Sequence, residues 1–298
     1  MKLKRSFTCL SLPILCFLVL LAYAYFIEPD RLVLNKAELT IDGWDPNFEG
    51  FRIAAIGDIH GGSNGVDEAK LRQIVETTNA QNPDLIVLLG DYVSQADGRG
   101  PDGRRGLKMP LDTIANDLGG LKARYGVIVV LGNHDGWFDN ARVSEAFAKA
   151  GYLVLDGAVT QIVNNGAVLR VIGLKDHLQI DSWSEYAAGA RALLADTEGT
   201  GNVLVLEHSP DVAPIITGNL SISNDLKLML AAHTHGGQVW LPVLGRPIVP
   251  SSYGQKYAAG HFKENGLDVF VTTGIGTSIL PFRFMVPPEI AIVTIRSG

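Results

Sequence analysis

The sequence predicts an α/β fold, a four-layer αββα sandwich of two mixed sheets flanked by helices. Five short apolar runs have the length and composition of buried strands, at residues 51–56, 85–89, 127–131, 203–206 and 226–230. Helical patterns at residues 67–80, 111–123, 140–150 and 182–195 alternate with these and later runs, as in α/β proteins. The chain has 298 residues, of which 47% are hydrophobic and 19% charged, so it can bury a sizeable core.

A second group of runs predicts the other sheet. Strand-like segments with turns and little helix between them lie at residues 153–155, 161–163, 168–172, 269–272 and 290–295. Residues 31–41 partly alternate apolar and polar side chains, as a half-buried strand does, and residues 43–46 form a turn. We expect residues 1–30 to be a basic and apolar N-terminal region and residues 31–298 to be the folded domain.

The N-terminal region is predicted to anchor the chain in a membrane. Lys2, Lys4 and Arg5 precede an uncharged stretch at residues 7–27, which at ~1.5 Å per residue can cross a ~30 Å hydrocarbon layer. Basic residues stay on the cytoplasmic side, so we expect a single span with an extracytoplasmic domain. The alternative is a signal sequence cleaved near Ala24, which would release a secreted protein.

Charge and cysteine content exclude some classes of function. The net charge of −6 offers no cluster of cations for phosphates, so we expect no nucleic-acid partner. Cys9 and Cys16 both lie in the apolar stretch, which leaves the domain without disulfides or thiolate ligands. The sequence does not predict an oligomeric state.

Oxygen and imidazole donors directly follow the strand-like runs. They occur in Asp58-Ile59-His60, Gly90-Asp91, Gly132-Asn133-His134-Asp135, Glu207-His208 and His233-Thr234-His235. The carboxyl ends of parallel strands meet at one edge of a sheet, where ligands bind. Five of the seven histidines belong to this series, and we leave the other two, His177 and His261, out of the site. The series predicts a two-metal site.

The donor types indicate hydrolysis of a phosphoester. Asp, Asn and His without sulfur suit two divalent cations such as Mn, Fe or Zn. Two ions ~3.5–4 Å apart can activate a bridging hydroxide for in-line attack and neutralise charge on a phosphoryl group. We expect Asn133 to be a neutral ligand, His134 to act on the departing oxygen, and Asp135 to accept a hydrogen bond from His134 and fix its tautomer.

The ordered motifs resemble the D-x-H, GD, GNH[DE], lone H and GHxH pattern of the calcineurin-like metallophosphoesterase superfamily. Residues 232–238 and 274–290 are similar to its bacterial membrane-associated or exported YaeI/YkuE-type phosphodiesterase branch. Ala232 replaces the usual glycine of the last motif. The resemblance implies one ion on Asp58, His60, Asp91 and His235. It implies a second ion on Asp91, Asn133, His208 and His233, with Asp91 bridging.

We therefore expect a phosphodiester or pyrophosphate hydrolase, catalytic through His134 and Asp135. Anchoring favours a membrane lipid such as a UDP-diacylglucosamine-type pyrophosphate, with Trp44, Phe48 or residues 279–282 against acyl chains. The segment of residues 94–110, which carries Arg99, Arg104, Arg105 and Lys108, either contacts anionic headgroups or is a solvated insertion. The alternatives are a phosphodiesterase or phosphatase for soluble substrates and a metal-binding scaffold without turnover.

Overall fold

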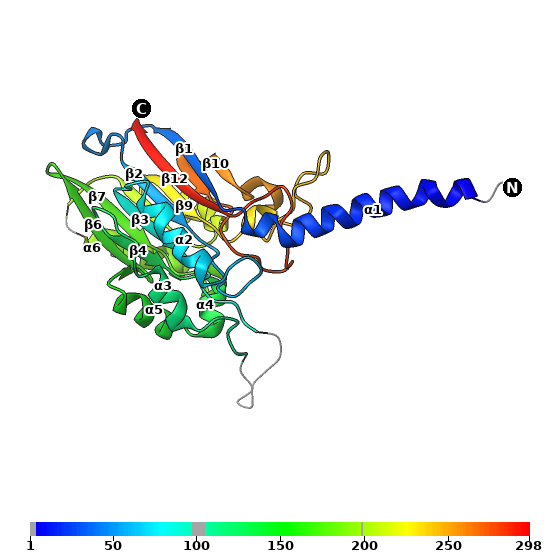
Figure 1. Ribbon diagram of the computed structural model, residues 1–298. Coiled ribbons are helices and arrows are strands. Elements are labelled where there is room, and N and C mark those ends of the chain that lie inside the picture. The colour runs from blue at the N-terminus through cyan, green and yellow to red at the C-terminus, as the bar shows by residue number, and fades with distance from the viewer. Residues whose placement is uncertain (1–3, 97–104, 198) are drawn as a thin grey trace.

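The structure is a sandwich of two six-stranded sheets with helices on both outer faces (Figure 1). It is a computed structural model that describes residues 4–96, 105–197 and 199–298. The first sheet has the order β1 (Val33–Ile41), β12 (Glu289–Ser297), β2 (Arg52–Ile56), β3 (Leu85–Leu89), β4 (Val127–Val130) and β5 (Leu153–Val154). The β12–β2 pair is antiparallel and the other pairs of this sheet are parallel.

The second sheet mixes parallel and antiparallel pairs in the same way. Its order is β10 (Gly260–Glu264), β11 (Leu267–Val271), β9 (Leu226–Ala231), β8 (Val203–Leu206), β7 (Ala167–Gly173) and β6 (Ala158–Asn164). The outer pairs β10–β11 and β6–β7 are antiparallel, whereas the inner pairs are parallel. Two mixed sheets confirm the predicted fold class.

Alternating side chains of each strand build the layers. In β2, Ile53 and Ala55 pack between the sheets, against residues such as Leu204 of β8, whereas Ala54 and Ile56 pack under helices. This alternation follows from the period of two along a strand. The inter-sheet core therefore fixes how the ends of the two sheets face each other.

The helices form the outer layers. Their bounds are α1 (Lys4–Phe26), α2 (Glu68–Asn79), α3 (Leu111–Leu118), α4 (Asn133–Phe138), α5 (Asn140–Lys149), α6 (Trp183–Asp196) and α7 (Ala213–Thr217). Short 3₁₀ segments occur at Glu28–Asp30, Pro46–Phe48, His177–Gln179, Pro210–Val212, His235–Gly237 and Gly254–Tyr257. Side chains of α2, α3 and α5 cover the first sheet, and those of α6 and α7 cover the second.

Helix boundaries follow local signals. The carboxylate of Asp67 accepts a hydrogen bond from the Lys70 amide at 2.8 Å and caps α2. The predicted helix over residues 111–123 is too long, because α3 ends at Leu118. Gly119 and Gly120 follow it, and glycine has a low helix propensity.

Four strands lie in a different sheet from the one predicted. The runs at residues 203–206 and 226–230 were grouped with those of the first sheet, but β8 and β9 belong to the second. Residues 153–155 and 290–295 were expected in the second sheet, but β5 and β12 belong to the first. β12 inserts between β1 and β2, and β5 forms the opposite edge. Strand-like composition shows that a segment is a strand but not which strand it pairs with, because pairing depends on contacts distant in sequence.

Helix α1 projects away from the domain (Figure 1). The segment Leu12–Asp30 has a mean hydropathy of 1.9 and 17% of it is buried, so it is long and apolar enough to cross a membrane. Its C-terminal end contacts the domain, where the Arg283 amide donates to the Ala24 carbonyl at 3.1 Å.

Candidate metal centre

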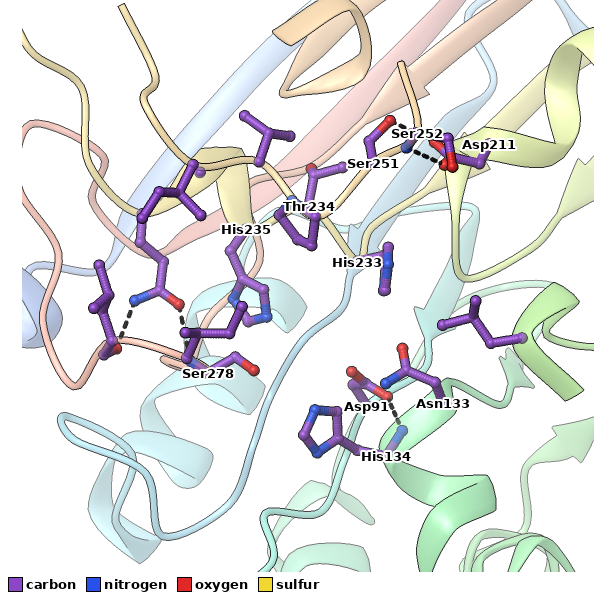
Figure 2. A pocket seen from close by; sticks show the side chains of 18 of the residues that line it. Asp91, Asn133, His134, Asp211, His233, Thr234, His235, Ser251, Ser252 and Ser278 are labelled. Carbon is purple, nitrogen blue, oxygen red and sulfur yellow. Dashed lines mark hydrogen bonds between the residues drawn. The ribbon is translucent and has the colours of Figure 1, made fainter. Parts of the chain in front are cut away.

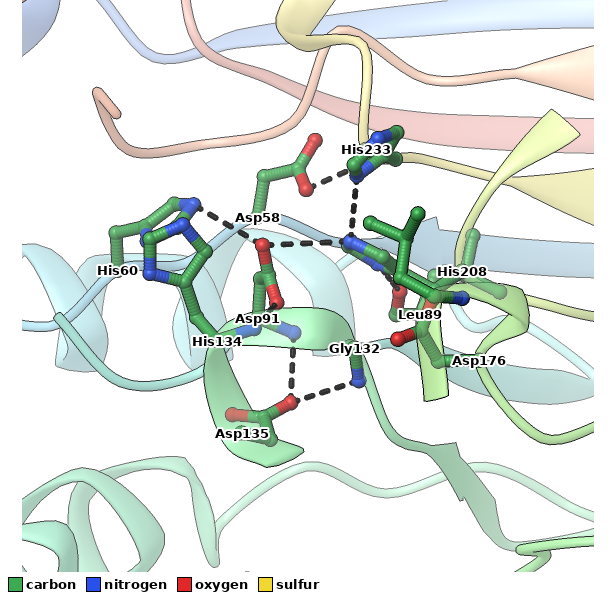
Figure 3. Close-up of polar contacts among 12 residues, drawn as sticks. Asp58, His60, Leu89, Asp91, Gly132, His134, Asp135, Asp176, His208 and His233 are labelled. Carbon is green, nitrogen blue, oxygen red and sulfur yellow. Dashed lines mark hydrogen bonds and ion pairs between the residues drawn. The ribbon is translucent and has the colours of Figure 1, made fainter. Parts of the chain in front are cut away.

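The predicted ligand residues lie at the carboxyl ends of strands from both sheets. Asp58 and His60 follow β2, Asp91 follows β3, and Asn133 begins α4 just after β4. From the second sheet, His208 follows β8, and His233 and His235 follow β9. His233 is partly buried, and the other six are buried. The structure thus brings all seven into one region (Figures 2 and 3).

The backbone is strained where these side chains converge. Left-handed φ angles occur at Asp58 (51°), His60 (47°), Asp91 (57°), His233 (68°) and His235 (51°). Residues other than glycine rarely adopt this region, which costs ~1–3 kcal/mol each. Such strain concentrates at functional sites, where the surrounding structure holds a side chain in one direction.

The donors form two groups. In the first, the Nε2 atoms of His60 and His235 are 3.2 Å apart, and Asp58 Oδ1 lies 3.9 Å from His235 Nε2. In the second, His208 Nε2 and His233 Nδ1 are 3.1 Å apart beside Asp91. In each group three ligand atoms lie within 4.8 Å of one another, so each could surround a cation.

Asp91 lies between the two groups. Its Oδ2 is 3.5 Å from His60 Nε2 and 3.3 Å from His208 Nε2 (Figure 3). Its Oδ1 accepts a hydrogen bond from the His134 amide at 2.8 Å. A Cβ atom on Gly132 would lie 2.3 Å from that oxygen, so only glycine allows the two loops to approach this closely.

The chemistry of the donors fits divalent cations. Among the described residues, the buried atoms Asp58 Oδ2 and Asn133 Oδ1 have no hydrogen-bond partner, a costly arrangement unless a ligand satisfies them. Burial lowers the pKa of His60 and of His233 to about 3. Both imidazoles are therefore neutral at pH 7, the state that binds a metal.

Asp91 is held as a carboxylate. Burial alone would raise its pKa, but the charge of the His208 imidazole and its hydrogen bond to Asp91 outweigh burial and hold the pKa well below its usual range. Anionic Asp91 with neutral His60 and His233 makes a hard and borderline donor set without sulfur, which suits Mn, Fe or Zn.

The centre forms part of the wall of a cavity of about 720 Å³. Asp91, Asn133, His134, His233 and His235 line it on one side (Figure 2). The rest of the lining is mixed: Ile248, Val249, Ile279 and Leu280 supply apolar side chains, and Asp211, Ser251, Ser252 and Ser278 supply polar ones. A phosphoester bond can therefore reach the centre while an apolar part of the same molecule contacts the apolar residues of the lining.

A family model described as calcineurin-like phosphoesterase matches residues 51–237, the segment that carries every ligand residue above. The chain belongs to the calcineurin-like phosphoesterase family. This confirms the resemblance, and metal-dependent hydrolysis of phosphoesters is the activity of the chain.

Curated relatives match most of the chain. It is 29% identical over 277 residues to the uncharacterized metallophosphoesterase YkuE of Bacillus subtilis, covering 92% of this chain and 89% of the relative. Phosphodiesterase YaeI of Escherichia coli is 26% identical over 274 residues, covering 91% of each chain. A transmembrane protein with metallophosphoesterase domain from Danio rerio is 25% identical over 303 residues, with 98% of this chain and 63% of that protein covered.

The expected contact between Asp135 and His134 is wrong. The buried carboxylate of Asp135 instead accepts backbone hydrogen bonds from Asp91 (2.8 Å), Tyr92 (2.9 Å) and Gly132 (2.9 Å). His134 Nδ1 lies 2.8 Å from Oε1 of Gln95, a residue that sequence reasoning missed. Asp135 thus holds the loops that carry Asp91 and Asn133, and Gln95 orients the imidazole.

His177 lies in the cavity, contrary to our expectation. It stacks on Trp183 and lines the cavity, and its Nδ1 is 3.6 Å from Glu207 and 3.8 Å from Asp176. Both carboxylates directly precede a histidine in sequence, which was the only available signal. His261 instead pairs with Asp268 at 2.6 Å on β10–β11 and is not part of the cavity lining.

The expected contacts of Trp44 and Phe48 with acyl chains are wrong. Trp44 and Phe48 are each only 2% exposed and belong to the core between the sheets, so they cannot contact acyl chains. Ile279 is 71% exposed and lines the cavity, as a lipid-contacting residue could. Arg99 and Arg104 lie outside the described residues.

Proposed function

We propose that this family member hydrolyses a phosphodiester or pyrophosphate bond with two divalent cations held by the two donor groups, Asp91 bridging them. The position of Asp91 Oδ2, 3.5 Å from His60 and 3.3 Å from His208, carries this proposal. When bound, the cations supply activation of a water nucleophile and neutralise charge on the phosphoryl group. A scaffold without turnover is disfavoured because His134, positioned for proton transfer, lines the same cavity.

His134 is the residue that exchanges a proton with the departing oxygen. Gln95 Nε2 donates to the His134 carbonyl at 2.8 Å, so its Oε1 is the atom that faces His134 Nδ1. An amide oxygen can only accept, so Nδ1 carries the hydrogen and Nε2 is left for the cavity. Burial lowers the pKa of this imidazole, which makes its protonated form a stronger acid.

The anchor and the cavity favour a lipid substrate. Helix α1 can span a bilayer and ends at the domain, with only Glu28–Asp30 and three further residues (Ile27, Arg31 and Leu32) before β1. Ile248, Ile279 and Leu280 give the cavity lining an apolar side. We propose a lipid with a phosphodiester or pyrophosphate headgroup, such as a UDP-diacylglucosamine-type molecule, whose headgroup lies at the centre and whose acyl chains contact this side.

Metal-dependent turnover tests the reaction. The full chain in detergent should hydrolyse bis-p-nitrophenyl phosphate after reconstitution with Mn, Fe or Zn, and lose this activity after chelation with metal content checked by elemental analysis. Undiminished turnover in chain shown to be metal-free would contradict the reaction. Metal binding without turnover of any phosphoester would favour the scaffold.

A paired comparison tests the substrate. We expect a higher kcat/KM for a lipid pyrophosphate in mixed micelles than for a water-soluble analogue with the same headgroup. Replacing Ile279 with Asp should lower kcat/KM for the lipid, because a charge would then face the acyl chains. It should leave kcat/KM for the soluble analogue unchanged, because Ile279 is exposed and its replacement does not disturb the buried ligand residues. Equal values for both substrates would favour a phosphodiesterase or phosphatase acting on soluble compounds.

A further inference from the structure

Large apolar side chains are exposed around one end of the domain. Outside α1, the described residues include Val243 (103% exposed), Leu244 (66%), Ile248 (51%), Ile279 (71%) and Met285 (51%). Isolated exposed apolar residues are ordinary, but a group of which two members, Ile248 and Ile279, also line the cavity indicates a surface that binds something. We call these five residues the apolar rim.

A tight hairpin presents its outermost members. The amides of Leu241 and Gly245 each donate to the other's carbonyl, at 2.7 and 2.9 Å, so the backbone turns at Pro242, Val243 and Leu244. Val243 has a left-handed φ of 74°, unusual for a β-branched residue. The two backbone hydrogen bonds therefore hold the turn in a conformation that exposes the side chains of Val243 and Leu244 to solvent.

Backbone hydrogen bonds connect the apolar rim to the C-terminal end of α1. The Trp240 amide donates to the Phe284 carbonyl at 2.9 Å, which places the hairpin beside residue 285. The residue before Phe284, Arg283, donates its amide to the Ala24 carbonyl of α1, and the Phe284 ring meets the Tyr23 ring edge-on at 6.5 Å. In Figure 1 this part of the chain lies on the side from which α1 leaves the domain.

We propose that the apolar rim is a second membrane contact, inserted into the interfacial layer of the bilayer that α1 spans. This inference rests on the membrane anchoring in the proposed function. A membrane is the partner that the position of the rim favours, because the surface is continuous with the end of an apolar helix. The stretch Val239 to Gly245 and the stretch Ser278 to Phe282 contain no charged residue that would oppose insertion.

The consequence is an orientation for the cavity. α1 alone would leave the domain free to rotate about one attachment, whereas α1 and the hairpin together hold it at two. Ile248 and Ile279 belong both to the rim and to the cavity lining. The cavity then opens toward the lipid surface, and a headgroup enters it without the lipid leaving the membrane.

Depth-dependent quenching tests the contact with the full chain in phosphatidylcholine–phosphatidylglycerol vesicles. A fluorophore is placed on Val243→Cys in a background with Cys9→Ala and Cys16→Ala, and quenched by lipids that carry a nitroxide on the acyl chain. Val163→Cys on β6 is the matched control, since Val163 is also exposed (57%) and β6 lies at the end opposite α1 (Figure 1). Natural Cys16, labelled after Cys9→Ala, reports whether α1 is embedded.

The expected result is about a twofold loss of fluorescence at residue 243, as for groups buried ~5–10 Å into the interface, with little loss at residue 163. Quenching at residue 16 but not at residue 243 would overturn the inference and leave the anchor intact. Absence of quenching at residue 16 would mean that the anchoring itself is wrong, and the rim inference with it. A label on residue 243 that is shielded from an aqueous quencher but is not quenched by the nitroxide lipid would indicate that a second copy of the chain covers the rim. That result would also overturn the inference.

Discussion

Asp91 is the residue on which both donor groups depend. Its Oδ2 faces an imidazole of each group, and Asp58 is not placed in this way. Asp91→Ala should therefore reduce bound metal from two ions per chain to one or none and abolish detectable diesterase activity. Elemental analysis after gel filtration measures this, with Asp112→Ala on exposed Asp112 of α3 as the control. Two ions retained by Asp91→Ala would show that it does not bridge.

His134 should matter for chemistry and not for metal content. We expect His134→Ala to keep its metals and to lose roughly 10²–10⁴-fold in rate with poor leaving groups, the usual range for acid catalysis. Substrates with good leaving groups need less protonation, so the loss of rate with them should be smaller. Rates across a series of substituted phenyl phosphodiesters measure this. A uniform loss along the series would assign His134 to substrate binding.

Gln95 should act through His134. Its amide holds both the His134 carbonyl and Nδ1, at 2.8 Å each, so Gln95→Ala frees the ring and should cost ~10–100-fold in rate, as loss of an orienting partner does at metal sites. Gln95→Glu keeps an acceptor for Nδ1 and should recover part of the rate. The same leaving-group series applied to Gln95→Ala should show the dependence seen for His134→Ala. A change in KM alone would argue that Gln95 contacts substrate.

At the scale of elements, the turns after β3 and β4 are tied together by one buried carboxylate. Asp135, at the start of α4, accepts amide hydrogen bonds from Asp91, Tyr92 and Gly132. Asp135→Asn turns an amide group toward these donors and leaves at least one unsatisfied, at a cost of ~1–3 kcal/mol. We expect a lower free energy of unfolding in urea for the metal-free protein. Asp139→Asn, at the helix cap of α5, is a comparison in which the capping oxygen is retained.

The sequence predicts elements better than their pairing. The ends of β2, β3, β4, β8 and β9 could be located because each apolar run stops where donors begin. The position of β12 beside β2 could not be predicted, because an apolar strand has the same composition whichever sheet it joins. Asp135 and His177 were misjudged for a related reason. Their partners depend on the left-handed turn at Asp91 and on the 3₁₀ turn His177–Gln179, which local composition does not reveal.

At the scale of the whole molecule, the centre exists only when the two sheets are packed. Asp58, His60, Asp91 and Asn133 come from the first sheet, and His208, His233 and His235 from the second. His208 Nδ1 lies 2.7 Å from the Leu89 carbonyl, which links β8 to the end of β3 across the interface. Because each donor group takes ligand residues from both sheets, the packing of the sheets against each other is what completes each group, and the loops direct the side chains.

The orientation of the molecule in the membrane follows from the charges beside α1. Lys2, Lys4 and Arg5 precede the apolar stretch, and Glu28 and Asp30 follow it, so we expect the N-terminus inside and the domain outside. The Val163→Cys variant lacking Cys9 and Cys16 makes this measurable in intact bacterial spheroplasts. A membrane-impermeant maleimide should label it without lysis, while a cytoplasmic protein with an exposed cysteine stays unlabelled. Labelling of residue 163 only after lysis would place the domain, and its substrate, on the cytoplasmic side.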